Sequence, residues 1–170
     1  MPNLNSNNFF QQNPYAVSHP FRPVIITDNL KTPENIGQII RLAGNIGCKN
    51  VLVINDFERP RLSKIKRMGE VAGPVVNWQF CTSDELFSHI PDNYVLTALE
   101  TAPQSTNLFT TTLPQKMALI VGNEINGINP LLLQKVQLSV HIPVTGSVKS
   151  LNVSHAAAVC LFEWLKQQIQ

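Results

Sequence analysis

The sequence has few cysteines and few charged residues, and it has no apolar run long enough to cross a membrane. Its three cysteines, Cys48, Cys81 and Cys160, form no CxxC pair and lie in apolar surroundings, which argues against a disulfide framework and a zinc site. Charged residues make up 14% of the chain, and a net charge of +2 is weak evidence for a polyanionic partner. We therefore expect a soluble, cytoplasmic protein without a signal peptide, a membrane span or a metal.

Two common phosphate-binding motifs are also missing. The turn Gly122–Gly127 follows an apolar run, but it has neither the GxGxxG spacing of dinucleotide-binding proteins nor the GK[ST] of a P-loop. It carries Glu124 instead of a lysine, and a carboxylate repels phosphate but could favour a cation or a hydroxyl-rich ligand. A nucleotide-dependent oxidoreductase is disfavoured for this reason.

The sequence does contain a regular alternation of strand-like and helix-like segments. With 44% apolar residues in 170, it can form one core, and the alternation predicts an α/β fold with a mostly parallel sheet flanked by helices. The predicted strands cover residues 24–27, 51–54, 75–80, 94–99, 117–121 and 138–142. The predicted helices cover residues 33–46, 62–71, 83–90 and 129–136, and a last helix begins at residue 153.

Local signals predict where these helices begin and end. Thr32 and Ser83 are expected N-caps, and Gly47 is an expected helix stop. Residues 1–22 are rich in Asn, Gln, Ser and Pro without periodicity. We therefore expect a flexible polar arm over residues 1–22 and one folded domain over residues 23–170.

Asn35, Gly37 and Arg41 form the first candidate site, at the start of a helix that follows a strand. Open α/β sheets bind ligands beside the carboxyl ends of their strands, which favours a site here. A solvated surface arginine is the alternative for Arg41. Gly37 lowers helix propensity, so it is expected to permit close packing or close approach of a ligand.

Glu124 is the second candidate, and Ser150 with Asn152 is the third. Glu124 could line a site or could be a turn carboxylate that caps the next helix. Ser150 and Asn152 lie between a strand and the last helix, in a loop of small and polar residues that lets a ligand approach closely. Their alternative role is that of helix N-caps.

In this order, three motifs resemble those of the SpoU (TrmH-like) RNA 2′-O-ribose methyltransferases of the SPOUT superfamily. They are Asn35-x-Gly37-x-x-x-Arg41, Gly122-x-Glu124-x-x-Gly127, and Ile142-Pro143-x-x-Gly146 followed by Ser150-Leu151-Asn152-Val153-Ser154. The departures are Asn123, where Ser is common, and Val144, where Met is frequent. The resemblance covers about residues 23–170. It implies a SPOUT-type domain with a C-terminal trefoil knot, and a homodimer that shares its active sites.

The resemblance also implies S-adenosylmethionine as methyl donor and an RNA ribose 2′-hydroxyl as acceptor. This donor has no phosphate to cradle, in agreement with the acidic turn. The implied donor-binding residues are Leu99, Glu100, Gly122, Asn123, Gly127, Ile142, Val144, Gly146, Ser150 and Leu151. The implied catalytic residues are Arg41, Asn35, Glu124, Ser150 and Asn152. Because a guanidinium is effectively always protonated, we expect Arg41 to orient a phosphate or stabilise the developing oxyanion.

A cluster of cations within nine residues is the expected RNA contact, although a solvated helix face is the alternative. The cluster consists of Arg59, Arg61, Lys64, Lys66 and Arg67. The absence of an appended RNA-binding domain resembles the minimal members of the family, which modify tRNA, including its wobble ribose. We therefore expect a tRNA substrate, with a ribosomal RNA methyltransferase or a non-catalytic RNA-binding relative as alternatives.

Overall fold

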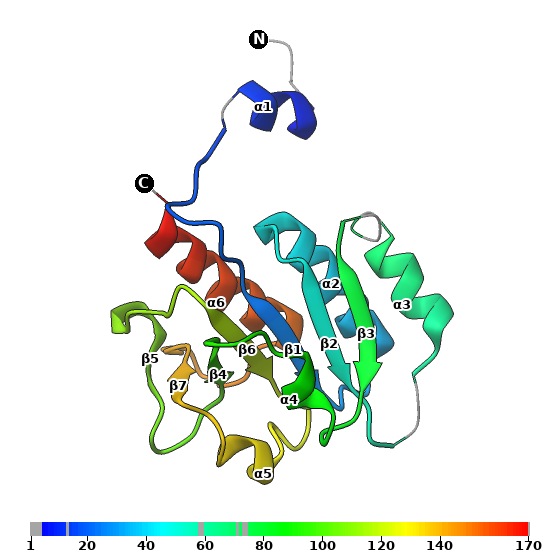
Figure 1. Cartoon of the computed structure of the whole chain (residues 1–170). Coiled ribbons are helices and arrows are strands. Elements are labelled where there is room, and N and C mark those ends of the chain that lie inside the picture. The colour runs from blue at the N-terminus through cyan, green and yellow to red at the C-terminus, as the bar shows by residue number, and fades with distance from the viewer. Residues whose placement is uncertain (1–4, 13, 58–59, 71, 73–74, 170) are drawn as a thin grey trace.

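The computed structural model describes residues 5–12, 14–57, 60–70, 72 and 75–169, and its strands form one sheet (Figure 1). In the described residues the sheet has seven strands in the order β3-β2-β1-β6-β4-β7-β5, and every neighbouring pair is parallel. The strands are β1 (Val24–Asp28), β2 (Asn50–Ile54), β3 (Asn77–Cys81), β4 (Val95–Leu99), β5 (Thr106–Asn107), β6 (Met117–Val121) and β7 (Leu138–His141). The predicted α/β class with a mostly parallel sheet is confirmed.

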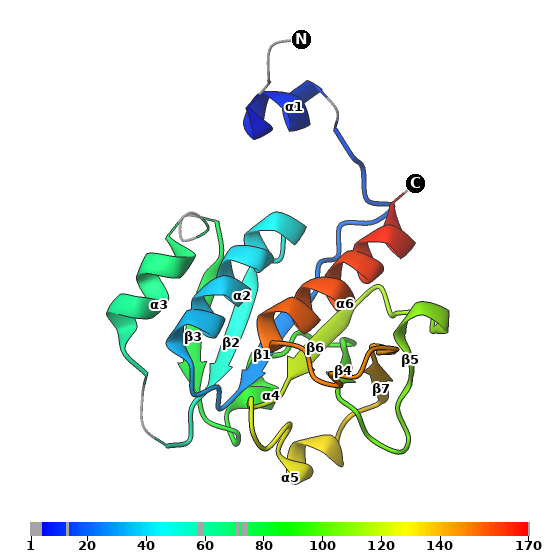
Figure 2. The same ribbon diagram turned by 180° about the vertical axis from the view of Figure 1, so that it is seen from behind.

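Helices cover both faces of the sheet, but unequally. Seen from behind, α2 (Pro33–Ile46), α3 (Leu62–Gly69) and α6 (Val153–Gln168) lie across one face (Figure 2). The short helices α4 (Leu86–His89) and α5 (Pro130–Leu133) lie on the other side, near the carboxyl ends of the strands (Figure 1). A 3-10 turn, η1 (Leu108–Thr110), follows β5.

The core consists of two apolar layers, one on each face of the sheet. Every residue of β1 and β6 is buried, as expected for central strands covered on both sides. Side chains alternate between the faces, so Ile25 packs in the layer with Trp164 of α6, whereas Ile26 packs in the layer with Leu86 and Leu132. Because all of these strands are parallel, their carboxyl ends meet at one edge of the sheet, where the connecting loops can form a site.

Two predicted helix caps are not formed as expected. Thr32 occupies the N-cap position of α2, but its side chain makes no capping hydrogen bond. Ser83 does not cap a helix, because α4 begins only at Leu86 and the Ser83 hydroxyl donates to Asp56 at 2.5 Å. Gly47 ends α2 as predicted, in a left-handed conformation with φ of +79°.

Other predicted boundaries differ by a few residues. The helix predicted over residues 129–136 is only the single turn α5, whose N-cap Asn129 accepts a hydrogen bond from the Leu131 N–H. The strand predicted over residues 75–80 begins at Asn77. The end of the helix predicted over residues 62–71 lies partly outside the described residues.

The segment predicted as a polar arm contains a short helix, α1 (Ser6–Gln12), whose residues are all exposed and which stands away from the sheet (Figure 1). After it, the chain returns to the end of α6. Val17 forms a β-bridge with Ile169, and a hydrogen bond of 2.9 Å joins the His19 ring to the Gln168 side chain. Residues from Val17 onward thus contact the domain, and the flexibility of the arm stays a prediction.

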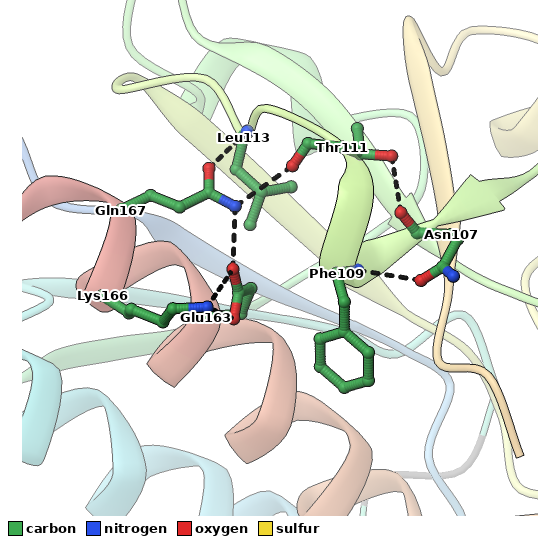
Figure 3. A network of polar contacts seen from close by, with 7 residues as sticks. All are labelled: Asn107, Phe109, Thr111, Leu113, Glu163, Lys166 and Gln167. Atoms are coloured by element: carbon green, nitrogen blue, oxygen red, sulfur yellow. Dashed lines mark hydrogen bonds and ion pairs between the residues drawn. The ribbon is translucent and has the colours of Figure 1, made fainter.

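A polar network fastens the last turns of α6 to the segment after β5 (Figure 3). The Gln167 side chain accepts from the Leu113 N–H at 2.9 Å and donates to the Thr111 carbonyl at 3.1 Å. Glu163 accepts from Gln167 at 3.0 Å and pairs with Lys166 at 3.2 Å. The network therefore holds the C-terminal end of α6 beside residues 111–113.

Candidate functional site

Loops from the carboxyl ends of β4, β6 and β7 surround a cavity of about 520 Å³, here called the loop cavity. All of the expected donor-binding residues except Gly146 line it. A Cβ added to Gly146 would meet no heavy atom within 4 Å. The three strands are neighbours in the sheet although they are distant in sequence, and this arrangement gathers the loops.

The turn Gly122–Gly127 requires both of its glycines. A Cβ on Gly122 would overlap the backbone of Gly127 and Ile128. Gly127 has a φ of +69°, and a Cβ there would lie 2.5 Å from a carboxylate oxygen of Glu100. Backbone hydrogen bonds of 2.9 and 3.0 Å between Asn123 and Gly127 close the turn.

Two side chains expected to bind the donor hold this turn in place. Asn123 accepts from the N–H groups of Ile125 and Asn126 and donates to the Asn29 carbonyl at 2.6 Å. Glu100 accepts from the Ile128 N–H at 3.0 Å. Both residues line the loop cavity, so they shape its wall.

Glu124 contacts the start of α2. Its carboxylate accepts from the backbone N–H groups of Lys31 at 3.0 Å and Thr32 at 3.2 Å, and from the Asn35 side chain at 2.8 Å. Partial burial by itself raises the pKa of the Glu124 carboxyl, but the hydrogen bonds that it accepts outweigh this effect and the net pKa is lowered. The next helix is instead capped by Asn129, so the capping alternative for Glu124 is wrong.

Asn152 is both a helix cap and a member of the same polar chain. Its side-chain oxygen accepts from the N–H groups of Ser154 and His155 at the start of α6, and its amide donates to Asn35 at 3.1 Å. Asn35 in turn donates to Glu124. Hydrogen bonds thus join one residue from each of the three sequence motifs, while Ser150 lies nearby in the lining of the loop cavity.

Arg41 lies apart from the other candidate catalytic residues. It is exposed on α2, six residues beyond Asn35, which corresponds to roughly 9 Å along the helix axis. The loop cavity of this chain is lined by other residues. Gly37 serves helix packing, since a Cβ there would lie 2.5 Å from the Met68 Cβ and 2.8 Å from the Ile65 carbonyl oxygen of α3.

The predicted cationic cluster is divided between two surfaces. Arg61 and Lys64 line a cavity of about 720 Å³, here called the basic cavity, beside the ends of β1 and β2. Lys66 and Arg67 line a separate cavity of about 470 Å³ on another side of α3. Arg59 lies outside the residues that the structure describes. The described members of the cluster therefore line two cavities, and their contact with RNA stays a prediction.

Several residues of the loop cavity lie outside the three sequence motifs. His141 lines it, and a hydrogen bond of 2.9 Å joins its ring to the Ser105 hydroxyl. Thr101 and Lys149 line it as well. Each of these three residues directly precedes or follows a predicted site residue, so proximity in sequence was the available signal.

None of the helices described here has both the length and the apolar character needed to cross a membrane. Within the same described ranges, no three His, Cys, Asp or Glu side chains gather in a way that could hold a metal ion.

The profile of the SpoU rRNA Methylase family matches residues 22–162, and the chain belongs to this family. One relative is the 23S rRNA (guanosine-2′-O-)-methyltransferase RlmB of Pasteurella multocida (strain Pm70), which is 30% identical over 148 residues. That alignment covers 86% of this chain but only 60% of the relative.

Solved structures with the same fold support the architecture. An AdoMet-bound rRNA methyltransferase from Sinorhizobium meliloti superposes with a TM-score of 0.79 at 20% identity, over 91% of this chain and 60% of the other. A structure described as giving insights into the 2-OH methylation of C/U34 on tRNA has a TM-score of 0.72 at 22% identity. In that case the match covers 88% of this chain and 92% of the other.

Proposed function

We propose that this protein transfers a methyl group from S-adenosylmethionine to a ribose 2′-hydroxyl of RNA. The observation that carries the proposal is the hydrogen-bonded chain Glu124–Asn35–Asn152, which links the three motifs at the loop cavity. Membership of the SpoU family supports the same reaction. An RNA-modifying enzyme of this kind would work in the cytoplasm.

The residues of the loop cavity suit this donor. Leu99, Ile142 and Leu151 offer apolar surface for an adenine ring, and exposed backbone of the loops offers hydrogen bonds. The carboxylates of Glu100 and Glu124 in the lining suit a cationic sulfonium better than a phosphate. The donor supplies an electrophilic methyl group, and the protein must align the attacking oxygen with it.

Arg41 is proposed to act on the RNA rather than on the donor. Its guanidinium remains charged, so it can bind a phosphate beside the target ribose and stabilise the oxygen anion that develops as the hydroxyl loses its proton. Because Arg41 is remote from the loop cavity of its own chain, we propose that it serves the cavity of a second subunit in a homodimer. The half-exposed ring of Phe162 on α6 is available for such an interface.

Mixed dimers test this shared site. Arg41→Ala removes the proposed RNA contact, and Leu151→Arg places a cation where the donor's sulfonium and adenosine are proposed to bind. Each variant alone should be inactive, whereas subunit exchange between the two should restore one intact site in each mixed dimer. Sedimentation as a monomer at working concentration would contradict the proposed dimer. A stable dimer without restored activity would contradict the shared site.

We propose tRNA as the substrate, with ribosomal RNA as the second candidate. The match that spans 92% of a chain studied for tRNA C/U34 methylation supports tRNA. The name of the RlmB relative favours ribosomal RNA, but this chain covers only 60% of that protein. Incubation with radiolabelled donor and bacterial tRNA or 23S rRNA, followed by mapping of methylated riboses, decides between them. Donor binding without transfer to either RNA would identify a non-catalytic relative.

We also propose that the C-terminal segment forms a trefoil knot. The position of β7 inside the sheet, between β4 and β5, supports this, because the segment that leads to α6 begins beside internal strands. Pulling the unfolded chain by its two ends should then leave it shorter than the contour of 170 residues at about 3.5 Å each. A full contour length would contradict the knot.

A further inference from the structure

The loop cavity and the basic cavity share one wall. Asn123 and Gly127 line both, so the turn Gly122–Gly127 lies between them. The many hydrogen bonds that hold this turn keep the two cavities in a constant relation. A ligand in the basic cavity would therefore be separated from a methyl donor in the loop cavity only by this turn.

The rim of the basic cavity combines positive charge with an exposed aromatic ring. Arg61 is exposed, and Lys64 is paired with Glu34 at 2.9 Å, so Arg61 is better placed to receive an external anion. Phe57 is 84% exposed on the loop after β2. A phenyl ring held in solvent beside cations is the combination with which proteins bind unstacked bases and their phosphates.

The floor of the basic cavity is rigid because its polar groups bind one another. Asn29, at a φ of +48°, donates to Asp28 at 2.8 Å and to Asp56 at 3.0 Å. The buried Asp28 carboxylate also accepts from the Asn129 N–H at 2.6 Å. These groups shape the floor without offering many hydrogen bonds to a ligand.

Asn126 has a different position, at the exposed edge of the same cavity. Its backbone N–H donates to the Asn123 side chain at 3.2 Å, which fixes where its own side chain begins. A carboxamide both donates and accepts, so it can pair with the edge of a base.

We propose that the basic cavity receives one unstacked nucleotide of the RNA substrate, with its base stacked on Phe57, its edge at Asn126 and its phosphate at Arg61. This inference rests on the proposed function: because the turn separates the two cavities, the nucleotide bound here is a neighbour of the one whose ribose meets the donor. The volume of about 720 Å³ lies within the range of small-molecule sites. Removing this neighbouring nucleotide from its stack leaves its base free to stack on Phe57.

Fluorine NMR on the full chain labelled with 4-fluorophenylalanine tests the site without any methyl transfer. The chain has eight phenylalanines, and Phe57→Leu identifies the ring 57 signal. Nucleoside 5′-monophosphates should shift that signal more than ribose 5-phosphate, which has no base. Arg61→Ala should weaken both kinds of ligand, whereas Asn126→Ala should alter the preference among the four bases.

Phe87→Leu is the matched control. Its ring is also exposed, at 38%, but lies on α4 with the Lys135 ammonium 4.4 Å from its centroid, and it lines neither cavity. Phe57→Leu should weaken binding of the RNA substrate by about ten-fold with donor affinity unchanged, and Phe87→Leu should change neither.

The possible failures are distinguishable. If the fluorine signal of Phe57 does not shift with mononucleotides, or shifts equally with ribose 5-phosphate, the nucleotide pocket is excluded. If Phe57→Leu methylates RNA as well as the unaltered protein, the pocket is excluded and the proposed function stands. If the Phe57 signal shows that mononucleotides bind but methyl transfer is never detected, the pocket is supported and the proposed function is contradicted.

Discussion

The two walls of the loop cavity are built in different ways. The turn Gly122–Gly127 is tied to β4 by Glu100, to the loop after β1 by Asn123 and to the start of α2 by Glu124. A second wall is formed by residues 149–152 of the segment 145–152, which is exposed throughout, and Lys149 donates back to the Val144 carbonyl at 3.2 Å. We infer that the turn is preformed, whereas the exposed segment adjusts when a ligand binds.

The largest expected effect comes from adding a methyl group to the rigid wall. Gly122→Ala would force its Cβ into the backbone of Gly127 and Ile128, which cannot move away as a flexible side chain could. We expect a loss of about 3 kcal/mol in the free energy of unfolding and a loss of donor binding. Urea denaturation and calorimetry with S-adenosylmethionine measure the two. Unchanged stability would show that the turn is less rigid than its contacts indicate.

The next largest effect on stability is expected from removing the hydrogen bonds between the turn and the start of α2. Glu124→Ala leaves three hydrogen-bond donors to solvent, and because Glu124 is partly exposed we expect a cost of only about 1 kcal/mol. Glu124→Gln keeps an acceptor oxygen and should cost less. Ser150→Ala, in the exposed wall, is the matched control and should stay within about 0.5 kcal/mol.

The same tie should depend on pH. The pKa of Glu124 is lowered in the folded protein, so its carboxylate stabilises the fold above the ordinary value of 4.5, and this contribution disappears as the pH falls through the lower folded value. The stability difference between the unaltered protein and Glu124→Gln should therefore be constant from pH 7 to about pH 5 and shrink below it. Both proteins contain the other titratable groups, so the contributions of these groups cancel in the difference. One such group is Asp28, whose pKa is raised by burial. A difference that grows on acidification would reverse the assigned direction.

The smallest effect is expected at Gly146, in the exposed segment that leads to the second wall. A Cβ on Gly146 meets no atom within 4 Å, so Gly146→Ala should change the free energy of unfolding by less than about 1 kcal/mol, and in the stabilising direction. If this wall moves to close on the donor, the same change should reduce the association rate more than the stability. Stopped-flow binding compared with urea denaturation separates the two. A destabilisation equal to that of Gly122→Ala would remove the contrast between the walls.

The sheet and most helix boundaries could be predicted because their signals are local. The β-branched run at residues 24–27 and the apolar run at residues 117–121 indicated strands, and they are the neighbouring central strands β1 and β6. Gly47 indicated the end of α2 because only a left-handed residue suits that position. The three motifs, read in order, also indicated the family to which the chain belongs.

The two failures in cap prediction involve distant partners. Thr32 occupies the N-cap position without a side-chain bond, and its backbone N–H is bound by Glu124, which lies 92 residues away in sequence. The Ser83 hydroxyl binds Asp56 at a separation of 27 residues instead of capping a helix. A short-range rule does not include such partners, because their proximity depends on how the strands are ordered in the sheet.

The α/β class and the central strands could be predicted from the residues alone, since hydrophobic periodicity and turn chemistry act over a few neighbouring residues. The folded structure was needed to show that Glu124, Asn35 and Asn152 form one hydrogen-bonded chain and that Arg61 faces a different cavity from Arg67. It also decided that Arg41 lies apart from the loop cavity of its own chain. The physical reason is that the order of parallel strands and the rotation of each helix are determined by packing of the whole core, which no local segment specifies.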